Sequence, residues 1–506
     1  MVKKPLLQNI PISISDSSWL LLILLLATVV RLYRLGYQSL WYDEAFSWAV
    51  AGAPLRTALA AILTDGGNPP LYQYFVLHPL LYLGQSEEII RLPSVVFGIL
   101  SVPLIYKIGR LCFGRKVGLG SALWLSLSPL HVWYSQEARM YAMVVFLSLG
   151  SIYFFLRVLR ENDWKLWLGF VVCTALAYPT NYSAFLVSLV QLAFIICTFR
   201  THYQVLRRWT ISQALAFLPT VPWVVALLSR EMKSFGFGWI PRPGPLDPLK
   251  TLWNFSLGYT GALTPFVALS LLFFAFAFLH GLWPQHSRAE GDAPQAPTFP
   301  YAQLFLAMWL ILPIAFVYLI SQLLVPIYID RFLLVALPPY LILVAYGLLR
   351  VKNATVWRGL ILALTLTISL SLSRIYFDPV YAKEDWRGLA GYIQQKSQSN
   401  DVIFLETLEG TLPFNYYYQG QLERVPMLAN RTIAPLDEIT QEHDRIWLVY
   451  PYPHDTTHFV AKPGPLNLYG EETEPTIRSW LVAHRRDIVE ERDFSGLRLI
   501  LYEPPP

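Results

Sequence analysis

The chain has 506 residues, of which 55% are hydrophobic and only 14% are charged. Its mean hydropathy is +0.42, whereas an average soluble domain has about 25% charged residues. This composition excludes an ordinary soluble protein and indicates an integral membrane protein. The formal net charge of +5 does not indicate a nucleic-acid binder, because the cations lie in loops between apolar runs rather than in a basic stripe interleaved with aromatic residues.

Apolar runs long enough to cross a bilayer recur through the first three quarters of the chain. Eleven of them are predicted to be membrane spans, near residues 16–35, 91–110, 117–135, 139–158, 166–182, 183–199, 210–229, 258–282, 302–325, 332–349 and 357–374. We interpret the first run as a retained anchor, because the nearest small-residue cleavage pattern lies about twenty residues beyond it.

The distribution of lysine and arginine predicts the orientation of these spans. Basic clusters occupy the loops at 107–116, 157–165, 200–208 and 350–358. The positive-inside rule places these loops and the N-terminus in the cytoplasm, and everything after residue 374 outside. Counting the short apolar segment 69–84 as a twelfth span would reverse this pattern. We therefore predict that this segment is an interfacial helix, lying on the outer membrane surface or over the neighbouring acids.

The tail has a different composition and predicts a second domain. Alternating patterns predict helices at 384–395 and 477–484 and strands at 401–405, 446–450 and 497–502. Strands that alternate with helices indicate a small α/β domain. The predicted organisation is a transmembrane catalytic domain over residues 1–375, with a first external loop at 36–90, and an extracytoplasmic α/β domain over residues 376–506.

Three polar clusters are predicted to lie on the same outer face. Asp43 and Glu44 follow the first span, Glu137 and Arg139 lie between the third and fourth spans, and Arg331 begins the tenth. Ionisable groups beside a bilayer usually face a cavity, a partner or a substrate rather than lipid. The outer loop at 230–254 is rich in glycine and proline, as in a mobile lid. The clusters therefore predict a functional site outside the cytoplasm.

The residue types in these clusters suit transfer from a lipid-linked phosphate. A guanidinium group can bind phosphate through two hydrogen bonds, and a carboxylate can take a proton from a hydroxyl nucleophile. No Walker-type or GxGxxG nucleotide motif is present in the sequence. Arg331 is therefore predicted to hold the donor phosphate. Arg31, at the outer end of the first span, either binds the same phosphate or reaches the lipid head groups.

Five segments in order carry a resemblance to a known family. They are WYDEA (41–45), NPPLYQYF (68–75), RLPSVVFGILSVPLIYKIGRLCFG (91–114), SPLHVWYSQEARMYA (128–142) and DRFLLVALPPYLIL (330–343). Together they resemble bacterial glycosyltransferases of the C superfold, of the family-39 type, related to protein O-mannosyltransferases and to the aminoarabinose transferase that modifies lipid A. The resemblance covers about residues 20–375, and KEDWRGLAGYI (383–393) resembles the start of the external domain of such proteins.

The resemblance implies a polyprenyl-phosphate sugar donor, an extracytoplasmic hydroxyl acceptor and an inverting transfer. By motif, Asp43 matches the catalytic base, and Glu44 is its neighbour in the catalytic pair. Glu137 and Arg139 match a second polar cluster that binds substrate, and Arg331 matches an arginine that faces the donor phosphate.

One segment departs from the family pattern. The histidine that usually precedes the two prolines is Asn68 here, so no role of that histidine transfers to this chain. Tyr72 in the same segment is predicted to bind substrate. The sequence has no second Asp-x-Asp pattern of the kind that metal-dependent relatives use, so we expect a reaction without metal or other cofactor.

Two other classes of function remain open from the sequence. A transporter or lipid flippase would use the acids to relay protons or bind substrate, but it predicts mid-span charges and related halves. An assembly protein would use the external domain as its interaction module. The predicted function is a glycosyltransferase of the cytoplasmic membrane, acting on a protein, lipid or polysaccharide; the sugar and the acceptor stay open.

Overall fold

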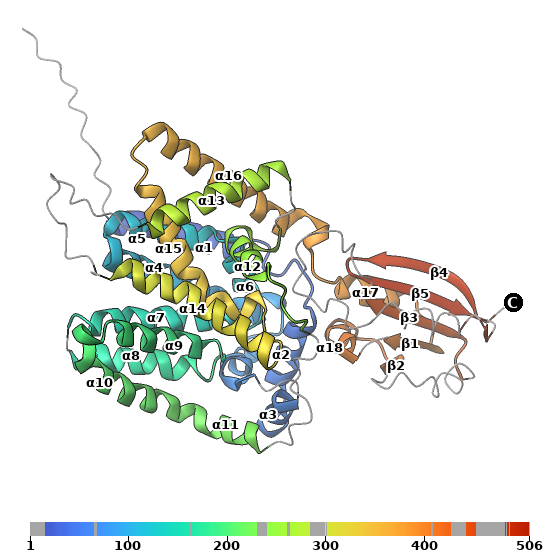
Figure 1. The fold of residues 1–506 in the computed structure, drawn as a ribbon. Helices are drawn as coiled ribbons and strands as arrows, with labels where there is room; N and C mark the ends of the chain where they lie inside the picture. Colours follow the sequence, from blue (N-terminus) through green and yellow to red (C-terminus); the bar gives the residue numbers. More distant parts are fainter. Residues whose placement is uncertain are drawn as a thin grey trace, which may run out of the picture.

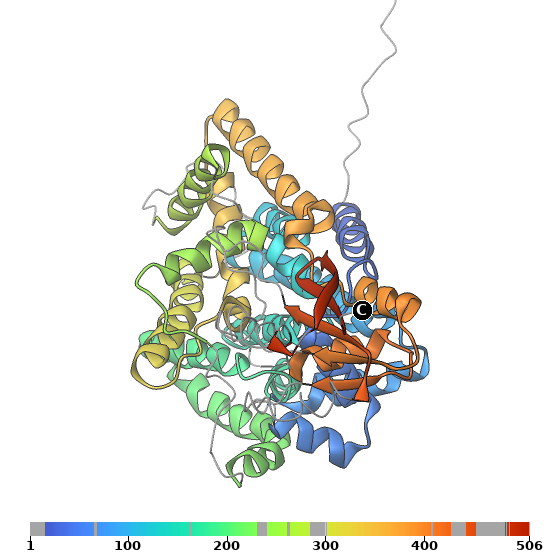
Figure 2. The ribbon, with the colours of Figure 1, turned by 90° about the vertical axis from the view of Figure 1, so that its right-hand side faces the viewer.

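The computed structural model describes residues 16–64, 68–161, 163–229, 240–260, 264–283, 299, 301–405, 408–426, 442–451, 481, 483–484 and 486–504. Helices form one large body, and a small β-sheet lies beside one end of it (Figure 1). Figure 2 views the molecule from that end, with the sheet in front of the helical body. The predicted fold class, a helical polytopic protein with a small C-terminal α/β domain, is confirmed.

The helical body contains long apolar helices joined by short irregular turns. Its α-helices are α1 (Asp16–Leu32), α2 (Tyr42–Gly52), α3 (Leu55–Thr64), α4 (Glu87–Phe113), α5 (Arg115–Leu127), α6 (Pro129–Ser135), α7 (Tyr141–Val158), α8 (Trp164–Ala177), α9 (Ala184–Cys197), α10 (Phe199–Phe217), α11 (Val221–Leu228), α12 (Asp247–Leu257), α13 (Pro265–Leu282), α14 (Ala302–Leu323), α15 (Leu337–Leu349) and α16 (Ala354–Phe377). Shorter helical turns are η1 (Leu71–Val76), η2 (His78–Tyr82), η3 (Leu218–Thr220), η4 (Gly258–Thr260), η5 (Asp330–Ala336) and η6 (Pro379–Tyr381).

Each predicted span overlaps at least one of these helices, but the helices differ in length. Among the described residues, six helical segments are long and apolar enough to cross a bilayer: Glu87–Phe113, Tyr141–Val158, Phe199–Leu228, Ala302–Leu323, Asp330–Leu349 and Ala354–Phe377. The predicted span at 117–135 is divided into α5 and α6 at Pro129, because proline cannot donate the hydrogen bond that would continue a helix. The count of eleven spans and their orientation stay predictions.

The segment predicted as an interfacial helix is irregular. It forms a π-helical turn, η1, and a 3₁₀ turn, η2, that meet at Leu77 beside Pro79. Both turns pack against α2, the helix that begins with the acidic pair. The segment therefore packs on α2, and its placement on the membrane surface or over the acids stays a prediction.

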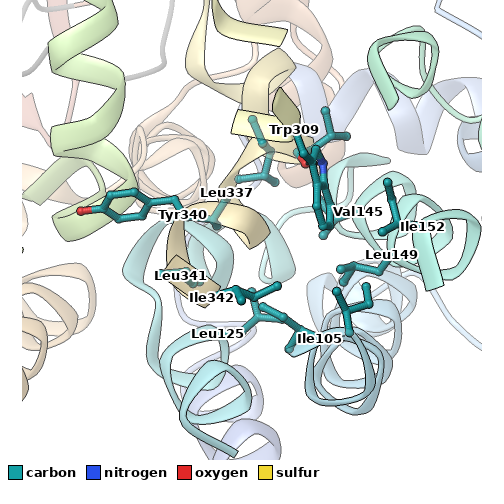
Figure 3. Packing of buried hydrophobic residues seen from close by; sticks show 14 of the residues in the cluster. Ile105, Leu125, Val145, Leu149, Ile152, Trp309, Leu337, Tyr340, Leu341 and Ile342 are labelled. Atoms are coloured by element: carbon teal, nitrogen blue, oxygen red, sulfur yellow. Dashed lines mark hydrogen bonds between the residues drawn. The ribbon is translucent and has the colours of Figure 1, made fainter. Parts of the chain in front are cut away.

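The core of the helical body holds several helices together. Figure 3 shows side chains of α4, α5, α7, α14 and α15 in contact, with the Trp309 indole among them. Trp309 is fully buried, and its Nε1 donates a hydrogen bond of 2.9 Å to the carbonyl oxygen of Val335. A buried indole normally finds such a partner. This bond fixes the backbone of η5, which carries Arg331 four residues earlier.

The C-terminal domain is a five-stranded mixed sheet with the order β2-β1-β3-β5-β4. Its elements are α17 (Trp386–Lys396), β1 (Asp401–Leu405), α18 (Leu408–Tyr417), β2 (Glu423–Pro426), β3 (Arg445–Pro451), β4 (Asp487–Phe494) and β5 (Leu497–Glu503). β1 runs parallel to β2 and β3, whereas β5 runs antiparallel to β3 and β4. The predicted strands at 401–405, 446–450 and 497–502 are confirmed, as is the first helix. The predicted helix at 477–484 lies mostly outside the described residues.

The C-terminal domain docks directly on the helical body. The Tyr417 hydroxyl of α18 accepts a hydrogen bond of 2.7 Å from the backbone N–H of Leu40 and donates one of 2.7 Å to Glu87 of α4. Arg387 of α17 also pairs with Glu87, at 2.5 Å. The domain is therefore fixed against the segment that leads into α2.

Close packing of α13 against α15 depends on two glycines, which gives a test of the fold. A Cβ at Gly347 would overlap the carbonyl oxygen of Ala277 and the backbone nitrogen of Gly281. Backbone atoms cannot move aside cheaply, so Gly347→Ala should lower stability by roughly 1–3 kcal/mol.

The matched control is Gly359→Ala in α16, where an added Cβ meets nothing within 4 Å. Helix propensity alone should make this variant neutral or stabilise it by about 0.5–1 kcal/mol. Thermal unfolding of both variants in detergent checks the pair. Equal unfolding temperatures for the two would contradict the close approach of α13 and α15.

Candidate active site

Three acids gather at the end of the helical body that faces the sheet. Asp43 and Glu44 lie in the first turn of α2, where the helix dipole favours negative charge. Glu137 lies in the turn between α6 and α7. Their side chains differ in exposure: 15% for Asp43, 0% for Glu44 and 2% for Glu137. Asp43 is therefore the acid that a substrate can reach most readily.

Two arginines from distant parts of the chain contact the Asp43 carboxylate. Arg331 Nη1 lies 3.0 Å from Asp43 Oδ2, and Arg139 Nε lies 3.8 Å from the same oxygen. Arg139 Nη1 also donates hydrogen bonds to the Asp43 carbonyl oxygen, at 3.2 Å, and to Ser47 Oγ, at 3.3 Å. The structure thus brings together the three polar clusters that the sequence placed on one face.

The neighbouring acid, Glu44, is bound on both oxygens by protein groups. Arg91 Nε and Nη2 donate to Glu44 Oε1 and Oε2 at 2.7 and 2.8 Å, a two-pronged pair. The backbone N–H of Ala138 adds a bond of 2.9 Å, and Lys383 Nζ another of 2.9 Å. Burial opposes ionisation of Glu44, but Arg91 and Lys383 outweigh it and lower its pKa to about 2. These contacts suit a positioning group rather than a base, so a catalytic role for Glu44 stays a prediction.

Glu137 is almost as deeply buried as Glu44 but has fewer charged partners. Its Oε1 accepts a hydrogen bond of 2.8 Å from Trp133 Nε1 and lies 3.5 Å from Lys383 Nζ. Burial raises its pKa above the ordinary range, although Lys383 acts in the opposite direction. Glu137 therefore takes up a proton more easily than Glu44.

Two residues of this network, Arg91 and Lys383, were missed by the sequence analysis. Arg91 could have been found from the sequence, because a charge at the outer end of an apolar run requires a partner. Lys383 gave no comparable signal, since it lies 339 residues from Glu44 along the chain.

Arg331 is held in place from its other side by α12. Its neighbour Asp330 accepts hydrogen bonds from Thr251 Oγ1, at 2.7 Å, and from Asn254 Nδ2, at 2.5 Å. Tyr328 also meets Thr251 at 2.9 Å. The loop predicted to be a lid, 230–254, extends into α12, so its residues 247–254 are helical, and its residues 230–239 lie outside the described part.

The other two predicted substrate-binding residues are engaged with the protein itself. The Tyr72 hydroxyl lies 2.5 Å from Ser94 Oγ, which in turn donates to the Arg139 carbonyl oxygen at 2.9 Å. Arg31 is fully buried and donates to Ser126 and Leu125 carbonyl oxygens at 3.0 and 3.1 Å. Tyr72 thus supports the Arg139 backbone and Arg31 ties α1 to α5. Substrate binding by either stays a prediction that these contacts do not favour.

A cavity adjoins the network on the side of Arg91 and Lys383. It is lined by Arg34, Leu35, Tyr37, Gln38, Arg91, Trp133, Gln136, Ile375, Tyr376 and Lys383. Three of these residues are cations and none is an acid. Within the described ranges, no group of three or more His, Cys, Asp and Glu residues is arranged to hold a metal ion, and metal independence stays a prediction.

Comparison with known proteins identifies the fold. The family model for dolichyl-phosphate-mannose-protein mannosyltransferase matches residues 67–225. The structure of ArnT from Cupriavidus metallidurans bound to undecaprenyl phosphate is similar at a TM-score of 0.60 and 15% identity, over 96% of this chain and 98% of that one. Comparison with curated proteins gives no match.

Two further structures share the architecture. Arabinofuranosyltransferase AftD from Mycobacteria is similar at a TM-score of 0.55 and 14% identity, over 98% of this chain and 40% of that one. The oligosaccharyltransferase AglB from Archaeoglobus fulgidus, in complex with an inhibitory peptide and a dolichol-phosphate, is similar at 0.50 and 9%, over 86% and 69%. The chain therefore has the fold of the C-superfold glycosyltransferases, and the resemblance found in the sequence is confirmed.

The buried pair between Glu44 and Arg91 makes a testable contribution to stability. Glu44→Gln leaves the Arg91 guanidinium buried without its counter-charge, which should cost about 3–5 kcal/mol of unfolding free energy. The control is Glu161→Gln, which removes the same charge from an exposed pair with Arg157 and should cause no measurable change. Chemical denaturation in detergent measures both. Equally small losses of unfolding free energy in the two variants would show that the buried pair does not stabilise the fold.

The low pKa of Glu44 also predicts how this contribution depends on pH. The folded-state pKa of about 2 lies below the ordinary value of 4.5. The stabilisation is therefore fully present above about pH 4.5 and is lost as the pH falls toward 2. The difference in unfolding temperature between wild type and Glu44→Gln should narrow between about pH 5 and pH 3. A difference that stays constant over this range would contradict the assigned ionisation of Glu44.

Proposed function

We propose that this protein is a membrane glycosyltransferase that moves a sugar from a polyprenyl-phosphate donor to a hydroxyl group of an acceptor outside the cytoplasm. The observation that carries the proposal is the partly exposed Asp43 carboxylate beside Arg139 and Arg331. A base and two phosphate-binding side chains thus share one location. The fold that holds them is the one found in ArnT bound to undecaprenyl phosphate.

Asp43 is the general base in this proposal. It is more exposed than Glu44 and Glu137, and its ion pairs with both arginines fall on one oxygen, Oδ2. Glu44 is committed to four donors, and its low pKa makes it a weak base. The two adjacent acids therefore have different roles: Asp43 reacts, and Glu44 holds the first turn of α2 in place.

The transfer step is a single displacement at the anomeric carbon. Asp43 accepts the proton of the acceptor hydroxyl as its oxygen bonds to that carbon. The bond from the anomeric carbon to the phosphate oxygen breaks, and the electron pair leaves with polyprenyl phosphate. Because the nucleophile and the leaving group lie on opposite faces of the sugar, the configuration inverts.

Arg139 and Arg331 stabilise the phosphate as negative charge develops on the leaving oxygen. Guanidinium groups in a water-poor site stabilise such charge more strongly than they would in bulk water. Both side chains are nearly fully buried, at 4% and 8% exposure. Without substrate, both guanidinium groups pair with the Asp43 carboxylate. An arriving phosphate would replace part of this pairing.

The lipid nature of the donor follows from where the site lies. The acids and arginines sit at the ends of apolar helices rather than in a separate soluble domain. A donor anchored in the bilayer presents its phosphate at this level, and the predicted outward orientation of this end would deny it a cytoplasmic nucleotide sugar. The sugar and the acceptor are left open by these arguments.

The decisive experiment is a transfer assay with the purified protein in detergent. Polyprenyl-phosphate sugars are supplied singly with a membrane extract as acceptor source, and release of free polyprenyl phosphate is followed. Asp43→Asn should lower turnover by about 10²–10⁴-fold, the usual contribution of a general base. The control, Asp163→Asn, alters a helix cap at the other end of the bundle with an equally good capping residue, and should keep full activity.

The two variants separate three outcomes. Release from one donor by wild type and Asp163→Asn, but not by folded Asp43→Asn, supports the proposed reaction. Full activity in Asp43→Asn would remove Asp43 as the base. Absence of release from every donor by folded wild type would reject the glycosyltransferase and favour transport of a lipid-linked substrate.

A further inference from the structure

Lys383 is the first residue of the C-terminal domain to enter the acid cluster. It lies between η6 and α17, and its side chain is only 10% exposed. Its ammonium group lies 2.9 Å from Glu44 Oε2 and 3.5 Å from Glu137 Oε1. A lysine is rarely buried in this way unless it is paired. The external domain therefore contributes a charged group to the site of the membrane domain.

The backbone around Lys383 is fixed to the segment that precedes α2. The Lys383 N–H donates to Gln38 Oε1 at 3.2 Å, and the Arg387 N–H donates to Ser39 Oγ at 3.2 Å. Asp385 accepts from the same hydroxyl at 3.4 Å and caps α17 by accepting from a backbone N–H at 2.9 Å. The lysine thus reaches the acids from a rigid support, so its position depends on docking of the domain.

The contribution of Lys383 is visible in the formal charge of the cluster. Three carboxylates are linked through the contacts described above to four cations, which gives a formal charge of +1. The carboxylates are Asp43, Glu44 and Glu137, and the cations are Arg91, Arg139, Arg331 and Lys383. Without Lys383 the charge falls to zero. Arg91 is occupied by Glu44 and by carbonyl oxygens, so it cannot move to compensate.

Lys383 also faces the cavity next to the cluster. Arg34 and Arg91 are the other cations of its lining. No acid lines this cavity, and the two acids beside it, Glu44 and Glu137, are neutralised by Arg91 and Lys383. Such a site favours anions. Because fields in a low-dielectric site extend over several ångströms, a charge need not touch a phosphate to strengthen its binding.

From these contacts we infer that Lys383 is a positioning residue of the active site, through which the docked C-terminal domain gives the cluster the positive charge that binds an anionic lipid phosphate. The inference rests on the proposed function for its substrate class. It assigns the external domain a direct part in donor binding, in addition to any contact with the acceptor.

The test compares Lys383→Met with Lys396→Met, which removes the same charge from an exposed position at the end of α17. Loss of one positive charge beside the phosphate should raise the donor KM by roughly tenfold, with kcat within about threefold of wild type because Asp43 and Arg331 are unchanged. Lys396→Met should match wild type. A drop in kcat at unchanged KM, or no change at all, would overturn the inference.

Two further variants separate charge from packing. Lys383→Arg keeps the charge and should keep the wild-type KM. Lys383→Met combined with Glu137→Gln restores the formal charge of +1 and should recover most of the lost donor affinity. A purely structural role for Lys383 predicts no such recovery. If Lys383→Met does not fold, Lys383→Gln takes its place; failure of both to fold, with or without Glu137→Gln, would show a role in folding and overturn the inference.

Binding of undecaprenyl phosphate, followed by tryptophan fluorescence without any sugar donor, keeps this result separate from the proposed reaction. The dissociation constant should rise about tenfold in Lys383→Met and recover in the double variant. If wild type binds the lipid phosphate but transfers nothing, the glycosyltransferase proposal fails while the role of Lys383 is still measured. If all variants bind it equally, the role of Lys383 fails while transfer can still stand.

Discussion

The buried ion pair between Glu44 and Arg91 is the constraint on which the outer end of the molecule depends. Two charges removed from water are costly unless geometry and additional hydrogen bonds satisfy them. Here the guanidinium group also donates to carbonyl oxygens of residues 35, 38 and 39, and the carboxylate accepts from the Ala138 N–H. The pair therefore joins the end of the first helix, α2, α4 and the turn before α7 into one unit. The position of Asp43, the residue before Glu44 in α2, is fixed by this unit.

Adjacency on a helix explains why two consecutive acids differ in role. Successive side chains on an α-helix point about 100° apart. Glu44 faces the buried arginine of α4, whereas Asp43 faces the arginines of η5 and of the turn before α7. One residue thus takes the desolvated position, with a strongly lowered pKa, and the other keeps a partly open carboxylate. A single helical turn provides both a structural anchor and a partly exposed carboxylate.

The sequence predicted those features that depend on local pattern or on topology. Apolar runs located the helices, and buried strands such as β1 were found because they are short apolar runs, Val402 to Leu405 in β1. The convergence of Asp43, Arg139 and Arg331 followed from placing their segments on one face. The edge strand β4 was missed because its exposed, charged residues give no apolar alternation. The partner of Glu44 in the C-terminal domain was missed because no local pattern reports a contact across 339 residues.

The charge network also links the protonation of Glu137 to docking of the C-terminal domain. When Lys383 is in place, it counteracts the effect of burial on the pKa of Glu137. Without the lysine, Glu137 would retain its hydrogen bond from Trp133, while Glu44 would retain Arg91 and the Ala138 N–H. Docking of the domain and loss of a proton from Glu137 are therefore linked, since each favours the other. The Glu44–Arg91 pair lies within the membrane domain and does not include Lys383, whereas the positive charge that the cluster offers to an incoming anion does.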